Sequence, residues 1–325
     1  LRLRVLYKWE KQFAPWEDGA SSEILGWIEQ KEHTWNALSG QALRPLSFLK
    51  RTYDPFDTAG VNAALEQEGL LYGAGYGRSL KPTFFLAPIV DKKRVDGHAV
   101  YVLGAELARD LATTPALNQD DCVVVRKASA KASLWDQMVY IKASGRFALR
   151  VGMGLCGVTG KGVEALQQGL EAVFAAQQET YIYHEIGEMH DTVFDRGVWR
   201  EMIAAYPHTP LELLVRSVKD LLADTNASGP LRHITKQKKT ASLAFYVAFF
   251  DGLSKELFPE LVAAFKDFAA SSDWDAVKKA VDTGYQNAKG HAETIMKIYE
   301  SRKGQVSGDR IKEEIEKEVL GRIVP

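Results

Sequence analysis

Apolar positions in the N-terminal half of the chain follow two different periodicities. Helical spacing predicts helices at residues 22–28, 58–65 and 134–141. Alternation, or a high content of β-branched and aromatic residues, predicts strands at residues 3–7, 83–90, 99–103, 122–126 and 147–151. The charged segment 91–97 between two of these strands indicates a hairpin. We therefore expect a small sheet with covering helices.

Beyond residue 162 the apolar residues recur at helical spacing to the end of the chain. Thr209, Pro210 and Glu212 have the order of a helix N-cap, a proline at the first helical position and a capping-box glutamate. The helix that they start has one apolar face. Residues 240–257 are apolar on nearly every side, which predicts one central helix of a bundle.

The last segment of the chain carries a narrow apolar stripe among many charges. Its members, spaced four apart, are Ile311, Ile315, Val319 and Ile323. Such a stripe predicts an amphipathic helix that docks either on its own domain or on another subunit. A homo-oligomer formed through this helix is therefore one predicted interaction.

The composition is that of an ordinary globular protein. Apolar residues make up 46% of the 325 residues, and 41 Lys and Arg residues balance 42 Asp and Glu residues. This balance creates no field that would attract a polyanion, so we expect no nucleic-acid or membrane partner. The longest apolar run, residues 241–250, has about half of the ~20 residues that span a bilayer.

The cysteine content points to a reducing compartment. Cys122 and Cys156 are far apart and form no CxxC pair, so neither a disulfide framework nor a cysteine zinc site is indicated. The first residues do not have the charged and then apolar pattern of a signal peptide. A cytoplasmic protein is expected.

Residues 152–157 spell GMGLCG and match the GxGxxG pattern of dinucleotide-binding loops. In that fold the loop follows a strand and places a pyrophosphate at the N-terminus of a helix. Here about thirty residues of helical pattern follow, without a second strand that ends in an acidic residue for the ribose. We expect residues 152–162 to be an interdomain hinge, with a nucleotide site as an alternative.

The helix predicted after residue 162 carries a polar stripe. Its members, which the helical step of about 100° brings onto one side, are Tyr181, His184, Glu188, Asp191 and Asp195. A His and a Glu four positions apart on a helix can bind one metal ion together. We identify His184, Glu188 and Asp191 as candidate metal ligands, with Asp191 either bound directly or orienting another ligand.

Two conformations of this helix are compatible with the sequence. Leu170 and Val173 precede the stripe in the same angular sector, so an unbroken helix would bury the ionisable groups. They would then need a metal ion or close ion pairing. Ile182 and Ile186 form an apolar stripe on the opposite side, and a kink near residues 179–181 would turn this stripe to the core and leave the polar stripe in solvent.

Known metal motifs are incomplete in this segment. Glu188 stands where the second histidine of HExxH belongs, and the paired Glu-x-x-His motifs of di-iron bundles do not occur. His208 and His233 could complete a site with His184, but no spacing requires it. At most half of a metal site is visible.

The helix that begins after Thr209 carries further charges on its polar side. Glu212, Arg216 and Asp220 lie four apart there, which indicates solvent-exposed ion pairs. Asp224 and Asn226 belong to the end of that helix, where turn-forming residues are common. We expect no chemistry from either group.

Three segments of the C-terminal half stand out together: residues 183–188 (YHEIGE), 211–216 (LELLVR) and 219–225 (KDLLADT). In combination they resemble a family of uncharacterised bacterial proteins with no assigned function. The resemblance implies a bacterial, cytoplasmic protein. It implies no mechanism.

We expect an α+β protein, with a mixed α/β domain over residues 1–158 and an α-helical bundle domain over residues 159–325. Because no catalytic constellation is assembled in the sequence, a binding or regulatory protein is favoured, and its small-molecule ligand and cofactor stay unidentified. The alternative is a metal-dependent enzyme that uses His184, Glu188 and Asp191. The two hypotheses differ on whether the helix that carries His184 is continuous.

Overall fold

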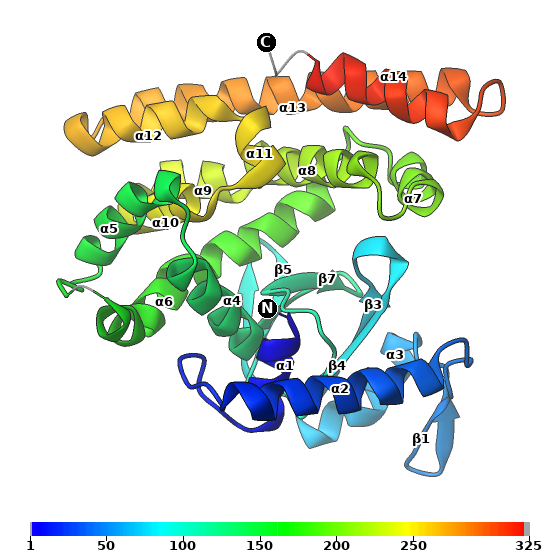
Figure 1. Cartoon of the computed structure of the whole chain (residues 1–325). Coiled ribbons are helices and arrows are strands. Elements are labelled where there is room, and N and C mark those ends of the chain that lie inside the picture. The colour runs from blue at the N-terminus through cyan, green and yellow to red at the C-terminus, as the bar shows by residue number, and fades with distance from the viewer. Residues whose placement is uncertain (1, 161, 322–325) are drawn as a thin grey trace. The chain divides into compact units, whose positions relative to one another are not determined.

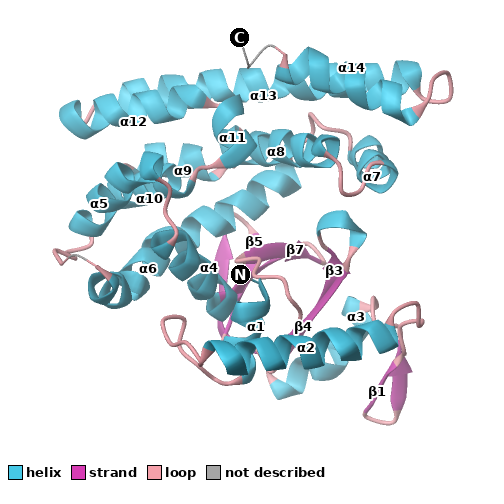
Figure 2. Ribbon diagram, viewed as in Figure 1, coloured by secondary structure: helices cyan, strands magenta, loops and turns pink. Residues whose placement is uncertain are grey.

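The computed structural model describes residues 2–160 and 162–321, and the chain forms two compact units (Figure 1, Figure 2). Unit 1 comprises Leu1–Gly77 and Lys81–Val139, and unit 2 comprises Arg78–Leu80 and Tyr140–Pro325. Unit 1 contains strands and helices, whereas the regular elements in the described part of unit 2 are helices. The predicted α+β fold class, with a mixed N-terminal domain and a helical C-terminal domain, is confirmed.

Unit 1 combines a sheet with helices. The helices are α1 (Arg2–Glu10), α2 (Ser21–Leu38), α3 (Thr58–Leu65) and α4 (Lys127–Val139). The strands are β1 (Leu46–Phe48), β2 (Arg51–Tyr53), β3 (Leu70–Tyr76), β4 (Pro82–Val95), β5 (His98–Leu103), β6 (Ala108–Arg109), β7 (Ala116–Gln119) and β8 (Cys122–Arg126). β1 and β2 form a hairpin of their own, and the main sheet has the order β3-β4-β5-β8-β7, with β6 paired to β4.

The long strand β4 organises the main sheet. Its first half pairs antiparallel with β3 and β6, and its second half pairs with β5 after a bulge between Ile89 and Asp91. Asp96 and Gly97, both at positive φ, make the turn between β4 and β5, as a two-residue type I′ turn requires. The predicted hairpin is confirmed, although β4 continues through most of the charged segment to Val95.

The prediction of a strand at residues 3–7 was wrong, because this segment lies in α1. The four consecutive residues 5–8 are buried there, whereas a half-buried strand would bury alternate residues. Leu6 and Tyr7 share a small core with Trp27 of α2. The rings of Tyr7 and Trp27 meet edge to face with 5.5 Å between centroids. Packing against α2 overrides the short alternation in the sequence.

Unit 2 is a helical bundle. Its helices are α5 (Arg146–Leu155), α6 (Val163–His190), α7 (Arg196–Ala205), α8 (Pro210–Thr225), α9 (Pro230–Gln237), α10 (Thr240–Phe249), α11 (Gly252–Leu257), α12 (Pro259–Ser271), α13 (Trp274–Arg302) and α14 (Gly308–Leu320). Among the described residues, no helix combines the length and the apolar character that crossing a membrane requires.

The prediction of a strand at residues 147–151 was also wrong, because α5 occupies this segment. Gly152 serves packing, because a Cβ there would lie 2.7 Å from the ring of Phe245 in α10, whereas a Cβ at Gly154 would meet no atom within 4 Å. The GxGxxG match therefore lacks the preceding strand of a dinucleotide site. Residues 140–158, which were predicted to belong to the first domain, lie in unit 2.

The single central helix predicted at residues 240–257 is two helices. α10 ends at Phe249, and α11 begins at Gly252, whose φ of +61° is a conformation that favours glycine. α10 is nevertheless buried along most of its length, as its apolar sequence predicts. Hydrophobicity alone did not reveal the break, because Leu253 and Leu257 continue the apolar pattern beyond it.

The apolar stripe of the last helix packs inside unit 2. Ile311, Ile315 and Val319 are at most 3% exposed, and α14 packs on α13, beside which it lies in Figure 1. Ile323 lies outside the described residues. The observation that motivated a homo-oligomer through this helix, an uncovered stripe, is therefore accounted for within the chain.

The start of α8 contains a buried charge that the sequence analysis placed in solvent. Thr209 caps the helix by accepting a hydrogen bond from the Glu212 amide (3.2 Å). The Glu212 side chain is fully buried, and its carboxylate accepts hydrogen bonds from the amides of Ser79 (2.9 Å) and His208 (2.8 Å) and from Arg216 (3.0 Å). The predicted Glu212–Arg216 pair exists, but its carboxylate is buried at the start of α8 rather than exposed to solvent.

Replacing Glu212 by glutamine should lower the free energy of unfolding by about 1–3 kcal/mol at pH 7, because hydrogen bonds to a charged group are lost. Burial raises the pKa of Glu212, but the two amides and Arg216 lower it to a net value below the ordinary 4.5. The charged form therefore stabilises the fold fully above pH 4.5, and this stabilisation is lost as the pH falls through the lowered pKa.

Urea denaturation at several pH values measures the difference in free energy of unfolding between wild-type protein and Glu212→Gln. This difference should become smaller below pH 4.5. The exposed Glu313→Gln change in α14 is the matched control and should alter stability by less than about 0.5 kcal/mol. A Glu212→Gln protein as stable as wild type at pH 7 would contradict the prediction.

Candidate metal centre

α6 is one unbroken helix, so the first of the two predicted conformations is the one observed. Ile182 and Ile186 are 0% and 1% exposed on one side of it. On the other side the side chains of His184 and Glu188 are only 28% and 27% exposed. Neighbouring helices cover both sides of α6, so the polar side chains of His184 and Glu188 lie largely within the bundle rather than in solvent.

α8 packs against this part of α6 and supplies two carboxylates, Asp220 and Asp224, one turn apart. The close approach depends on Gly187, where a Cβ would lie only 2.2 Å from the carbonyl oxygen of Ala223. Asn226 at the end of α8 donates a hydrogen bond to the Gly187 carbonyl (2.8 Å). The glycine thus allows a pair on α6, His184 and Glu188, to face a pair on α8.

A chain of hydrogen bonds fixes the imidazole ring of His184. Its Nδ1 lies 2.7 Å from Oδ1 of Asp224, and Tyr246 of α10 donates its hydroxyl to Oδ2 of the same carboxylate (2.5 Å). A carboxylate only accepts, so Nδ1 carries a proton and Nε2 is the nitrogen left for another partner. Orientation of a histidine by a carboxylate behind it is the usual arrangement at metal sites.

Three groups offer ligand atoms within reach of one ion. A ring nitrogen of His184 and one carboxylate oxygen each of Glu188 and Asp220 lie within 4.8 Å of one another, and His184 Nε2 is 4.0 Å from Glu188 Oε1. Atoms bound to one ion at about 2.1 Å can be at most about 4.2 Å apart. Small side-chain rotations would therefore bring all three atoms onto a common ion.

The charges around these atoms favour a cation. Burial raises the pKa of Glu185 to about 7 and that of Asp220 to about 6, although the charge of His184 acts in the opposite direction on both groups. For Glu188, burial raises the pKa, but His184 and Lys219 lower it to a net value below the ordinary one. Lys219 pairs with Glu188 at 2.7 Å. Carboxyl groups still outnumber cationic groups here.

The pKa of His184 also reflects this surplus of acid groups. Burial alone lowers it, but the charge and hydrogen bond of Asp224, followed by the charges of Glu185 and Glu188, raise it well above the ordinary 6.5. Without a metal ion the ring is therefore held in its protonated form at neutral pH. A metal ion at Nε2 must displace that proton.

Of the three predicted ligands, the structure brings His184 and Glu188 together and adds Asp220 to them. Asp191 follows the last residue of α6, and its Oδ1 accepts a hydrogen bond from the Val193 amide (2.9 Å), which shapes the turn there. Burial raises the pKa of Asp191. It does not belong to the group of three ligand atoms.

The two histidines considered as further ligands have other roles. His233 of α9 lies 2.7 Å from Glu179 and stacks on the ring of Tyr183 at 3.8 Å between centroids. His208 is the residue at positive φ before the cap of α8, where its amide binds Glu212. Neither belongs to the group formed around His184.

Sequence reasoning missed Asp220, Asp224 and Tyr246. Asp220 and Asp224 repeat the four-residue spacing of His184 and Glu188, and this second pair was the available signal. It was taken for a solvent-exposed face because the opposite face of α8 is clearly apolar. Tyr246 lies in a nearly all-apolar helix, where an aromatic residue is ordinarily a core residue.

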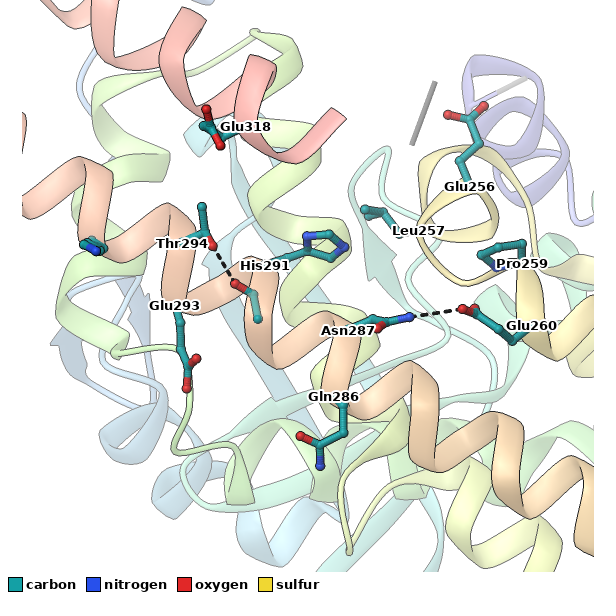
Figure 3. A pocket seen from close by; sticks show the side chains of 12 residues that line it. Glu256, Leu257, Pro259, Glu260, Gln286, Asn287, His291, Glu293, Thr294 and Glu318 are labelled. Atoms are coloured by element: carbon teal, nitrogen blue, oxygen red, sulfur yellow. Dashed lines mark hydrogen bonds between the residues drawn. The ribbon is translucent and has the colours of Figure 1, made fainter. Parts of the chain in front are cut away.

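Unit 2 also contains a polar cavity of about 920 Å³, which lies between α11, α12, α13 and α14 (Figure 3). Its lining includes Glu256, Glu260, Glu293 and Glu318, and Asn287 donates a hydrogen bond to Glu260 across it (3.1 Å). Within the described residues these carboxylates do not gather into a group of three ligand atoms. The spacing required for a metal ion thus distinguishes the His184 cluster from this merely acidic cavity.

Comparison with known proteins places the chain in a family. Residues 1–126 match the N-terminal domain, and residues 131–318 the C-terminal domain, of a "Family of unknown function (DUF6866)". The chain belongs to the DUF6866 family. The resemblance of the C-terminal half to a family with no assigned function is confirmed and extends over nearly the whole chain, whereas a bacterial origin stays a prediction. No curated protein and no solved structure matches.

Proposed function

We propose that unit 2 binds one divalent transition-metal ion through His184, Glu188 and Asp220, and that the protein is a metal-dependent enzyme. The observation that carries this proposal is the combination of three convergent ligand atoms with the Tyr246–Asp224–His184 chain behind them. A solvated polar stripe has no need of an oriented imidazole. A structural ion pair between His184 and Asp224 would not explain why a further carboxylate, that of Glu188, lies 4.0 Å from Nε2.

The donor set limits the choice of metal. One imidazole nitrogen and two carboxylate oxygens suit Zn²⁺, Mn²⁺ or Fe²⁺ and lack the thiolates that soft ions prefer. Three protein ligands leave at least one coordination position open, which is typical of catalytic rather than structural sites. In such a position the ion acts as a Lewis acid and lowers the pKa of a bound water, so we propose metal-assisted hydrolysis as the reaction class.

The residues around the ligands have separate tasks in this proposal. Asp224 and Tyr246 orient the ring of His184 and keep the proton on Nδ1. Lys219 holds Glu188 at 2.7 Å and itself lies over the Trp199 ring, 5.2 Å from its centroid. Gly187 sets the distance between α6 and α8. Together these contacts preorganise the site before an ion binds.

The proposal is tested by metal analysis of the purified, tag-free full chain. The protein is stripped with a chelator, titrated separately with Zn²⁺, Mn²⁺ and Fe²⁺ (the last without oxygen), and analysed for bound metal by mass spectrometry. One equivalent of at least one of these ions should bind. Failure to bind any of them at the protein concentrations used would overturn the proposal.

The orienting role of Asp224 predicts that Asp224→Asn lowers metal affinity about 10- to 100-fold, although Asp224 does not touch the ion. The amide is uncharged and no longer stabilises the ring as the carboxylate does. Competition with a chromophoric chelator measures the affinity. The matched control is Glu179→Gln, which removes the carboxylate partner of His233 on the same helix and should leave affinity unchanged. Equal effects of the two substitutions would contradict an orienting role.

A further inference from the structure

An apolar pocket lies wholly within unit 1. It has a volume of about 510 Å³, which falls within the range of about 300–1,000 Å³ common for small-molecule sites. Its walls come from the β1–β2 hairpin, α3 and the strands β3, β4 and β6. The aromatic side chains in the lining are Phe48, Tyr72, Phe84 and Phe85.

The aromatic walls are held in place by contacts with one another and with residues outside the lining. Phe48 stacks on Tyr53 with 4.8 Å between centroids, and Phe84 lies nearly parallel to Tyr72, at 21° and 6.4 Å. The Tyr72 hydroxyl donates a hydrogen bond to the Pro55 carbonyl (2.8 Å). Protein interiors are otherwise close-packed, so fixed rings around a void lack the contacts that an inserted molecule would provide.

The pocket offers no free charge to a ligand. Arg109 is the charged residue of its lining, and each of its nitrogens has a partner within the unit. Nη1 pairs with Glu106 (3.3 Å), Nε donates to the Asp110 carbonyl (3.2 Å) and Nη2 donates to the Ala112 carbonyl (3.0 Å). A charged ligand would lose its hydration without gaining a counter-ion, and the pocket therefore selects against one.

One polar group beside the pocket has no partner among the described residues. The hydroxyl of Tyr53, whose ring stacks on Phe48, is buried and unpaired. A buried hydroxyl without a hydrogen bond is destabilising.

We propose that this pocket binds an uncharged, mainly apolar small molecule with a flat ring system. The volume sets the size of the ligand, the fixed aromatic faces set its shape, and the neutralised Arg109 sets its charge. This site is separate from the metal centre in its residues, and the proposal does not depend on metal binding.

The neutral dye N-phenyl-1-naphthylamine tests the proposal, because its fluorescence rises in apolar surroundings. Titration of the full chain should show one saturable site. Ala108→Trp fills the pocket from an exposed position in β6 and should weaken binding at least tenfold, whereas Ala105→Trp, the same change at an exposed position outside the lining, should not. The sulfonated analogue 8-anilino-1-naphthalenesulfonate should bind at least tenfold more weakly than the neutral dye.

Thermal melting shows whether each variant is folded. Leu46→Asp is a second variant designed to block binding, because it places a charge in the wall of the pocket. It should weaken binding of the neutral dye as Ala108→Trp does. The proposal is overturned if the neutral dye shows no saturable signal, if both tryptophan variants bind it alike, or if the sulfonate binds as tightly as the neutral dye.

Discussion

Replacing His184 by alanine should lower metal affinity at least about a hundredfold, so that the variant is purified without metal. Loss of an orienting partner such as Asp224 lowers metal affinity about 10- to 100-fold, and loss of a directly bound ligand should lower it more. The substitution removes the nitrogen donor from a set in which Glu188 and Asp220 provide only oxygen. It also disconnects Asp224 and Tyr246 from the ion.

Competition titration with a chromophoric chelator, together with metal analysis, measures this loss. His233→Ala is the matched control, because His233 also pairs with a carboxylate of α6 at 2.7 Å and differs in lying outside the ligand group. The control should keep its affinity within threefold. The metal assignment fails if His184→Ala binds as wild type does, or if both histidine variants lose the metal equally.

Loss of metal can be separated from loss of fold. His184→Ala leaves Asp224 without its ring partner, so the unfolding midpoint of the metal-free variant should fall. The diagnostic quantity is the rise in midpoint when metal is added, since a ligand stabilises only the state that binds it. Wild type and His233→Ala should show this rise, and His184→Ala should not.

Half of the metal centre was visible in the sequence because half of it lies on one helix. His184 and Glu188 are four residues apart, and helical periodicity places them on one side of α6 without knowledge of the rest of the fold. Asp220 lies 36 residues after His184 in the sequence. It joins the other two ligands only because α8 packs on α6. Periodicity within one helix carries no information on which other helix will cover its polar side.

Asp191 shows the limit of extending a periodic pattern past a helix end. It continues the angular sector of His184 and Glu188 only if α6 continues, but α6 stops at His190. The carboxylate then turns to the Val193 amide. The end of the helix is set by this turn, which the polar pattern did not indicate.

The same reasoning explains which parts of the fold were predictable. α8 was predicted in detail because Thr209, Pro210 and its apolar face signal the start and the period of a helix locally. Residues 147–151 were mistaken for a strand because Phe147, Leu149 and Val151 alternate. They form a helix because α5 packs on α10, a contact between segments about a hundred residues apart.

Glu106 is a residue that no sequence pattern singled out, and its replacement by alanine should destabilise unit 1 by about 3–5 kcal/mol. Its side chain is fully buried. The carboxylate pairs with Arg126 at 2.7 Å and with Arg109 at 3.3 Å, and it accepts a hydrogen bond from Ser129 (2.9 Å). Alanine at this position would leave two buried guanidinium groups without their shared counter-ion.

Arg126 cannot relax into solvent to avoid this cost. It is 2% exposed, and its guanidinium lies 4.2 Å from the centroid of the Phe85 ring, in the core of the sheet. Urea unfolding of Glu106→Ala measures the effect, and Glu68→Ala, the same change at an exposed position, should shift stability by less than about 0.5 kcal/mol.

A second substitution separates charge from packing at Glu106. Glu106→Gln keeps the shape and the bond from Ser129 but removes the negative charge, so it should still cost much of what alanine costs. If glutamine is tolerated and alanine is not, the cluster is held by hydrogen bonds and volume rather than by ion pairing. Arg109 also lines the apolar pocket, so Glu106→Gln should leave its positive charge without a counter-ion there. The sulfonated dye should then bind more tightly than it does to wild type, and the difference in affinity between the neutral and the sulfonated dye should become smaller.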